Sequence, residues 1–144
     1  MDKTAKVINC FKERYNCSQA VLSSFSEELG IDLKHAQKIA SAFGGGIARN
    51  GETCGAVTGA LMVIGLKHWK PELNNDEAKM HIYNMSNRFM KEFKNRNNSV
   101  VCKELLDRDL STDEGRKKMK EENLSEKICE KLLRDATEIL EKMV

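Results

Sequence analysis

Apolar residues recur along the chain at intervals of three and four, the spacing that places side chains on one face of a helix. The clearest stripe runs through Ala78, Ile82, Met85, Phe89 and Phe93. No segment of strand length alternates regularly between apolar and polar residues. The pattern therefore predicts an all-α fold, which we expect to be a single-domain helical bundle of about six to seven helices spanning residues 1–144.

Capping residues divide this pattern into separate helices. Asn16 is expected to cap a helix that runs to about residue 29, and Asp32 a helix that follows it. Ser99 and Ser125 are expected to cap two later helices in the same way. The charged interval 107–123 predicts a solvated excursion with one marginal helix, for which Ser111 and Glu114 have the spacing of a capping box.

Four glycines fall within the eight residues from Gly44 to Gly51. Helical structure there would carry a large cost in backbone entropy, so the segment is predicted to be a loop. The next segment, from Glu52 to about Trp69, is apolar on most sides. We therefore expect a glycine-rich loop before a central helix that starts at Glu52.

Charge and hydropathy argue against nucleic-acid binding and against insertion into a membrane. Lys and Arg number 24 and Asp and Glu number 22, a balance that does not favour nucleic acid or an anionic membrane. The longest apolar run, Gly55–Leu66, is shorter than the roughly 20 residues that span a bilayer. The segment 1–6 lacks the apolar core of a secretory signal. We expect a cytoplasmic chain that binds no nucleic acid and inserts into no membrane.

Five cysteines in such a chain point to thiol chemistry, because thiols kept in a reducing compartment are usually catalytic, redox-sensing or metal-binding. Cys17, Cys54, Cys102 and Cys129 are each expected in the first turn of a separate helix, facing inward. A helix amino end stabilises a thiolate and lowers its pKa. Cys10 is assigned to the core. The alternative is that all five are small buried hydrophobes, which is the stronger explanation for any single cysteine but a weaker one for four placed alike.

Glycines next to Cys54 are the other candidates for a binding role. Glycine within a helix costs roughly 1 kcal/mol relative to alanine, so Gly55 and Gly59 need an explanation. Close packing between helices is the favoured explanation for Gly59. For Gly55, packing and access to the Cys54 sulfur by a second cysteine, a cofactor or a substrate are equally favoured. With Gly45 and Gly46 of the loop, these glycines form the candidate cofactor-binding set.

These motifs resemble those of the C_GCAxxG_C_C family of bacteria and archaea, which is named for its cysteine pattern. The matching residues are Asn16-Cys17-Ser18-Gln19-Ala20-Val21, Gly44-Gly45-Gly46 and Cys54-Gly55-Ala56-Val57-Thr58-Gly59-Ala60, followed by Cys102 and Cys129. The resemblance covers nearly the whole chain. One departure is that Cys54 precedes its glycine, whereas the family name places glycine first, so that Thr53 has no support from the family.

The resemblance implies a redox-active protein with four invariant cysteines, which makes Cys17, Cys54, Cys102 and Cys129 the expected site. Genes of the family often lie near transporter genes, so the resemblance also implies an association with a transport system. A redox partner protein is expected. A homodimer is one of the oligomeric states that the sequence leaves open. A similar domain accompanies haem domains in some cytochromes, which keeps a metal role among the alternatives.

Three functions follow from these residues. The first is a thiol–disulfide oxidoreductase or electron-transfer protein in which Cys54 attacks and a neighbouring cysteine resolves, with three pairings of the four thiols open. The second uses the same four cysteines, Cys17, Cys54, Cys102 and Cys129, to bind zinc or an iron–sulfur cluster, although none of them forms a CxxC pair. The third is a non-catalytic helical accessory module with core cysteines.

Overall fold

The structure is a computed structural model that describes residues 2–144. Within these residues eight α-helices form and no strand does. The helices are α1 (Lys3–Lys12), α2 (Cys17–Ser26), α3 (Leu33–Ile39), α4 (Gly55–His68), α5 (Asn75–Asn97), α6 (Cys102–Leu106), α7 (Asp113–Glu121) and α8 (Glu130–Glu141). The predicted all-α class is confirmed. The predicted count of six to seven helices was too low, because α7 is a full helix rather than a marginal one.

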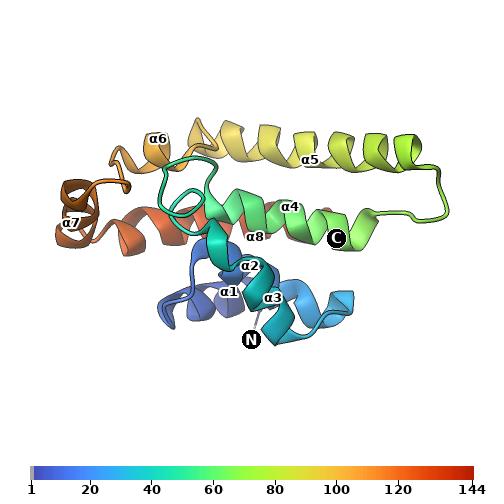
Figure 1. Ribbon diagram of the computed structural model, residues 1–144, viewed down its shortest axis with the longest axis horizontal. Helices are drawn as coiled ribbons and strands as arrows, with labels where there is room; N and C mark the ends of the chain where they lie inside the picture. The colour runs from blue at the N-terminus through green and yellow to red at the C-terminus, as the bar shows by residue number, and fades with distance from the viewer. Residues whose placement is uncertain (1) are drawn as a thin grey trace.

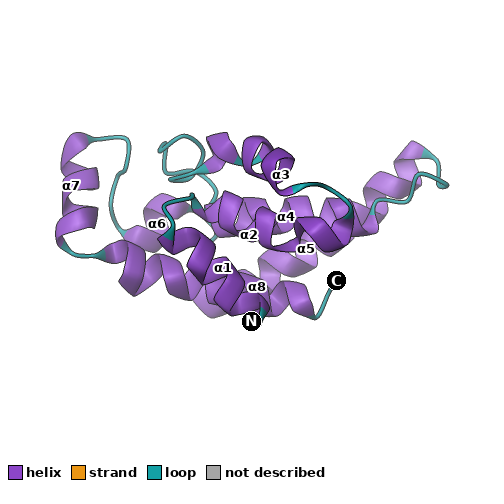
Figure 2. Ribbon diagram, turned by 90° about the horizontal axis from the view of Figure 1, so that it is seen from below, coloured by secondary structure: helices purple, strands orange, loops and turns teal. Residues whose placement is uncertain are grey.

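Helix α4 lies at the centre of the arrangement (Figure 1). It packs against α2 on one side and against α5 and α8 on the others, while α1 packs on both α2 and α8. In Figure 2, α7 lies at one end of the molecule and the turn from α4 to α5 at the other. No helix within residues 2–144 is long and apolar enough to cross a bilayer.

The main core forms where α4 meets its neighbours, and small residues set the distance between α4 and α2. A Cβ atom on Gly59 would lie 2.8 Å from the Ser18 carbonyl oxygen and 2.9 Å from the Cβ of Val21. Real Cβ atoms essentially never approach other atoms this closely, so a side chain at Gly59 would push the helices apart. Close helix packing therefore explains Gly59.

A second, smaller apolar cluster lies where α6, α7 and the start of α8 meet. Its buried members are Cys102, Leu106, Leu110, Leu124 and Cys129. The charged excursion is thus anchored by a few apolar side chains, while its surface carries ion pairs such as that of Arg108 with Glu122, at 2.5 Å. Two of the four candidate cysteines belong to this cluster, and Cys54 belongs to the main core.

The predicted caps hold where an Asn or Asp side chain reaches the first turn. Asn16 and Gln19 form a reciprocal capping box on α2, and Asp32 accepts from the His35 N–H at 2.8 Å. The cap predicted at Ser111 is wrong, because Thr112 occupies that position and accepts from the Gly115 N–H at 2.9 Å. Ser111 instead bonds to the Asp109 carboxylate.

Two further predicted caps, at Ser99 and Ser125, are also wrong. The Ser99 hydroxyl accepts from the Val101 N–H at 2.9 Å and donates to Glu104, and α6 begins only at Cys102. At Ser125 the backbone is already helical, because a π-helical turn over Ser125–Cys129 leads without a break into α8. A residue with helical backbone on both sides cannot act as an N-cap.

Candidate functional site

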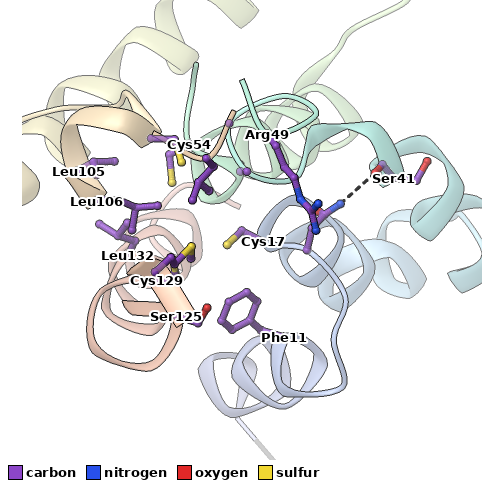
Figure 3. A pocket seen from close by; sticks show the side chains of 18 residues that line it. Phe11, Cys17, Ser41, Arg49, Cys54, Leu105, Leu106, Ser125, Cys129 and Leu132 are labelled. Carbon is purple, nitrogen blue, oxygen red and sulfur yellow. Dashed lines mark hydrogen bonds between the residues drawn. The ribbon is translucent and has the colours of Figure 1, made fainter. Parts of the chain in front are cut away.

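All four candidate cysteines line one cavity, which has a volume of about 410 Å³ (Figure 3). The cavity lies between the starts of α2, α4 and α6 and the turn that precedes α8. Cys10 is not among its lining residues, and the Cys10 sulfur instead lies 3.4 Å from the Ser23 hydroxyl. The fold therefore gathers four thiols from distant parts of the chain and leaves out the fifth.

Three of the four cysteines lie at the start of a helix, and the fourth lies within a continuous helical segment. Cys17 and Cys102 are the first residues of α2 and α6, and Cys54 is the N-cap residue of α4. Cys129 ends the π-helical turn directly before α8. The predicted first-turn positions hold for Cys17, Cys54 and Cys102 but not for Cys129, and α4 starts at Gly55 rather than at Glu52. The reason is that residues 52–54 are held in an extended pairing with the segment before α6.

This pairing fixes Cys54 and Cys102 through the backbone. The Cys54 N–H donates to the Val100 carbonyl and the Cys102 N–H donates to the Glu52 carbonyl, both at 2.7 Å. Thr53 and Val101 are the directly paired residues. Because successive side chains of an extended segment point to opposite sides, Cys54 and Cys102 emerge on the same side of the bridge.

Two glycines allow the chain to pass close behind these thiols. Gly46 has a φ of +69°, and a Cβ there would lie 2.6 Å from the Cβ of Cys102. A Cβ on Gly55 would lie 2.9 Å from the Cβ of Cys17 and 3.0 Å from the Ser18 nitrogen. The missing side chain at Gly55 thus lets α2, and with it a second cysteine, approach the start of α4. Of the four glycines predicted to bind a cofactor, Gly59 does not line the cavity, whereas Gly45, Gly46 and Gly55 do.

Burial dominates the protonation of Cys54 and Cys102. Burial raises the pKa of Cys54 to about 11, although the N–H groups of Ala56 and Val57 act in the opposite direction. Burial also raises the pKa of Cys102 to about 12, with a further contribution from the nearby Cys54 thiol. The prediction that a helix start would lower the pKa is therefore wrong for both, because desolvation of the thiolate outweighs the helix dipole.

Cys17 and Cys129 behave differently because their side chains interact with one another. Figure 3 shows the two sulfur atoms facing each other across the cavity. The hydrogen bond from the Cys17 thiol to the Cys129 sulfur raises the pKa of Cys17 well above the ordinary 9.0. The same bond lowers the pKa of Cys129, against the effect of burial. A donated hydrogen bond stabilises the thiolate that accepts it, so Cys129 is the acidic member of the couple.

The sequence favours Cys54 as the activated thiol and gives no prediction for Arg49 or Phe11, which also line the cavity. The contact between Cys17 and Cys129 depends on the packing of α2 against the turn before α8, for which the local sequence holds no signal. Arg49 could have been noted as a charged residue within the glycine-rich segment. Phe11 faces the cavity beside Cys17 and Ser125 (Figure 3).

The metal alternative uses the same four thiols. Among the residues that the structure describes, no group of three or more His, Cys, Asp or Glu side chains is placed to hold a metal ion. Tetrahedral zinc and iron–sulfur clusters both need several sulfurs converging on one point.

The fold and the site together define an all-helical protein with a cluster of four thiols around one cavity. The chain belongs to the C_GCAxxG_C_C family: the family model described as "Putative redox-active protein (C_GCAxxG_C_C)" matches residues 15–143. The predicted family membership is thereby confirmed. No curated protein and no solved structure matches the chain.

Proposed function

We propose that this protein is a thiol–disulfide oxidoreductase in which Cys129 is the attacking thiolate and Cys17 the resolving thiol. The observation that carries the proposal is that the Cys17 and Cys129 sulfurs face each other on the wall of one cavity (Figure 3). A thiolate is the reactive form in disulfide exchange, and a second thiol in contact with it can release the mixed disulfide. The redox-active description of the family agrees with this chemistry.

The exchange has two steps. The Cys129 thiolate attacks one sulfur of a disulfide R–S–S–R′, so that the S–S bond breaks, a mixed disulfide of Cys129 with R forms and R′–S⁻ leaves. Cys17 then attacks the Cys129 sulfur, its proton passes to the departing R–S⁻, and a Cys17–Cys129 disulfide remains. The substrate gains two electrons, which the two protein thiols lose. An external dithiol, itself becoming a disulfide, returns the protein to its starting state.

Cys54 and Cys102 have a secondary place in this proposal. Their raised pKa values keep them protonated at neutral pH, which makes them slow nucleophiles. They lie on the same cavity wall, so they can accept the disulfide from the first couple by a further exchange step. The redox partner protein, the association with a transport system and the cytoplasmic location stay predictions.

Mapping the first disulfide tests the assignment. The fully reduced protein is treated with less than one equivalent of hydroxyethyl disulfide, quenched with acid and alkylating agent, and digested without reductant. We expect a peptide pair linked through Cys17 and Cys129. In Cys17→Ser the mixed disulfide should accumulate on Cys129, because no resolving thiol remains. Cys10→Ser is the matched control and should give the wild-type pattern.

Two results would contradict the proposal. If the first disulfide forms between Cys54 and Cys102, before any link to Cys129, then Cys54 and Cys102 are the reacting thiols and the assignment to Cys17 and Cys129 is wrong. If no intramolecular disulfide forms while all thiols remain reactive toward alkylation, the protein is not a dithiol oxidoreductase, and the non-catalytic accessory module would be the better explanation.

A further inference from the structure

The cavity wall includes the side chain of Arg49, which is the one basic or acidic residue among the lining residues. The other lining residues are apolar or neutral, and no carboxylate is among them. Asp and Glu are common in the chain, with 22 in total, so their absence from the wall leaves the positive charge of Arg49 unopposed there. A ligand that carries a negative charge would find a complementary group in the cavity and no repelling carboxylate.

Within residues 2–144, Arg49, like Arg14 and Arg88, forms no ion pair, whereas the other arginines do. Arg96 pairs with Glu138 at 2.7 Å, Arg108 pairs with Glu122, and Arg116 pairs with Asp113. Within residues 2–144 no ion pair involves Arg49. Its guanidinium group therefore keeps its donors available for a bound anion, which it can contact through two parallel hydrogen bonds.

The loop holds Arg49 in this place by an uncommon backbone conformation. Residues 45–49 all have φ values between +52° and +69°, and three of them, Ile47, Ala48 and Arg49, are not glycine. The Arg49 N–H donates to the Gly44 carbonyl at 2.9 Å, which closes the turn. A Cβ on Gly45 would lie 2.9 Å from both the Cα and the Cγ of Arg49, so glycine there makes room for the stem of the arginine.

From this turn the Arg49 side chain extends along the rim of the cavity toward the start of α2 (Figure 3). On the other side of the cavity, Leu105, Leu106 and Leu132 lie beside Cys129. The site thus has a cationic end and an apolar end that carries the acidic thiol. A volume of about 410 Å³ falls within the range of small-molecule sites, roughly 300–1,000 Å³.

Access to the sulfurs is limited. The exposed fractions are 4% for Cys54, 7% for Cys102 and 6% for Cys129. A disulfide within a folded partner protein is carried on bulky backbone, which a cavity of this size does not admit without movement of the walls. A small organic disulfide is of a size that a cavity of about 410 Å³, with Cys129 on its wall, can hold.

We propose that the substrate is a low-molecular-weight disulfide bearing a carboxylate, bound with the carboxylate at Arg49 and the S–S bond at Cys129. This inference rests on the proposed thiol–disulfide function, which it deepens by naming the substrate class. The exchange steps and their electron balance are those given above, with R as the carboxylate-bearing half of the substrate.

A charge series of small disulfides tests the inference. The reduced protein is mixed with dithiodipropionate, hydroxyethyl disulfide or cystamine, which are anionic, neutral and cationic respectively, and the second-order rate constant of protein oxidation is measured. After correction for the intrinsic reactivity of each disulfide toward a free small thiol, we expect the anionic compound to react fastest and the cationic one slowest. In Arg49→Gln the ratio of the anionic to the neutral rate constant should fall about five- to tenfold.

Arg88→Gln is the matched control, because it removes the same charge from an exposed position on α5 that does not line the cavity. It should leave the anionic-to-neutral ratio unchanged. A wild-type ratio near one, or equal ratios in wild type and Arg49→Gln, would overturn the substrate class while leaving the thiol–disulfide function standing. Failure of all three compounds to oxidise Cys129 would instead refute the proposed function itself.

Discussion

Cys17 and Cys129 meet through their side chains, whereas Cys54 and Cys102 are brought together by the backbone. In the first couple a hydrogen bond between sulfurs raises the pKa of one thiol and lowers that of the other. In the second, a short extended pairing fixes both residues, and burial raises both pKa values. Both couples line the same cavity, so the type of contact rather than the location distinguishes them.

Tertiary contacts, rather than position on a helix, distinguish the activated thiol from the others. Cys17, Cys54 and Cys102 lie at helix starts, yet all three have raised pKa values. The one lowered pKa is that of Cys129, which lies within a continuous helical segment and accepts a hydrogen bond from Cys17. For Cys54 the backbone N–H groups of the first turn act in the expected direction but are outweighed by desolvation. A helix start is thus insufficient by itself to produce a reactive cysteine once the sulfur is removed from water.

Removing the acidic thiol should have the largest effect. We expect Cys129→Ser to lower the rate constant for oxidation by hydroxyethyl disulfide by a factor on the order of a thousand, because a neutral hydroxyl is a poor nucleophile toward sulfur. The rate is followed by release of the small thiol. Cys54→Ser should lower it much less and Cys10→Ser should not change it. If Cys54→Ser lowers the rate constant more than Cys129→Ser does, Cys54 rather than Cys129 is the attacking thiol.

A side chain at Gly46, which lies against Cys102, should lower the free energy of unfolding. Gly46→Ala is expected to lower the free energy of unfolding by about 2–4 kcal/mol, because the new Cβ combines positive-φ strain with contacts of 2.6–2.9 Å to Cys102 and Glu52. Gly30→Ala is the control, with a φ of +85° and nothing within 4 Å, and should cost about 1 kcal/mol. Urea denaturation measures both. Equal losses would show that the close approach to Cys102 contributes nothing.

Cys54 and Cys129 should also respond oppositely to alkaline pH. The folded pKa of Cys54, about 11, exceeds the ordinary 9.0, so its contribution to stability is complete below pH 9.0 and is lost as pH rises through 11. The folded pKa of Cys129 is lowered, so its contribution instead grows as pH rises toward 9.0. We expect the stability difference between wild type and Cys54→Ala to shift by about 1–2 kcal/mol across this range.

The matching measurement is urea denaturation of wild type, Cys54→Ala and Cys129→Ala at a series of pH values. The difference from wild type should fall with rising pH for Cys54→Ala and rise for Cys129→Ala. Because each comparison is with wild type at the same pH, the titration of lysine and tyrosine cancels to first order. Slopes of the same sign for both variants would contradict the assigned directions.

The helices and the family were predictable from the sequence because both depend on local patterns. The spacing of Ala78, Phe89 and Phe93 marks one helix face, and their side chains are buried along α5. Asn16 and Asp32 were predicted as caps because an Asx side chain acts within three residues of its own position. The cap predicted at Ser99 fails because the segment before α6 pairs with residues 52–54, which are distant in the sequence, and the cap predicted at Ser125 fails because the backbone there is already helical.

The site was predictable only as a set of residues. The sequence indicates that Cys17, Cys54, Cys102 and Cys129 belong together, and the fold places all four on one cavity. Which of them is acidic depends on desolvation and on one contact between sulfurs, and both are tertiary properties. The left-handed turn that presents Arg49 likewise includes three residues, Ile47, Ala48 and Arg49, whose type does not predict a positive φ.

The most direct test of this account is the pKa of each cysteine in the reduced protein. Alkylation is carried out with isotope-coded iodoacetamide at a series of pH values, and the rate at every cysteine is read by mass spectrometry of its peptide. We predict that Cys129 titrates first, below 9.0, and that Cys17, Cys54 and Cys102 titrate above it. In Cys17→Ala the Cys129 midpoint should move upward. A midpoint for Cys54 below that of Cys129 would contradict the account.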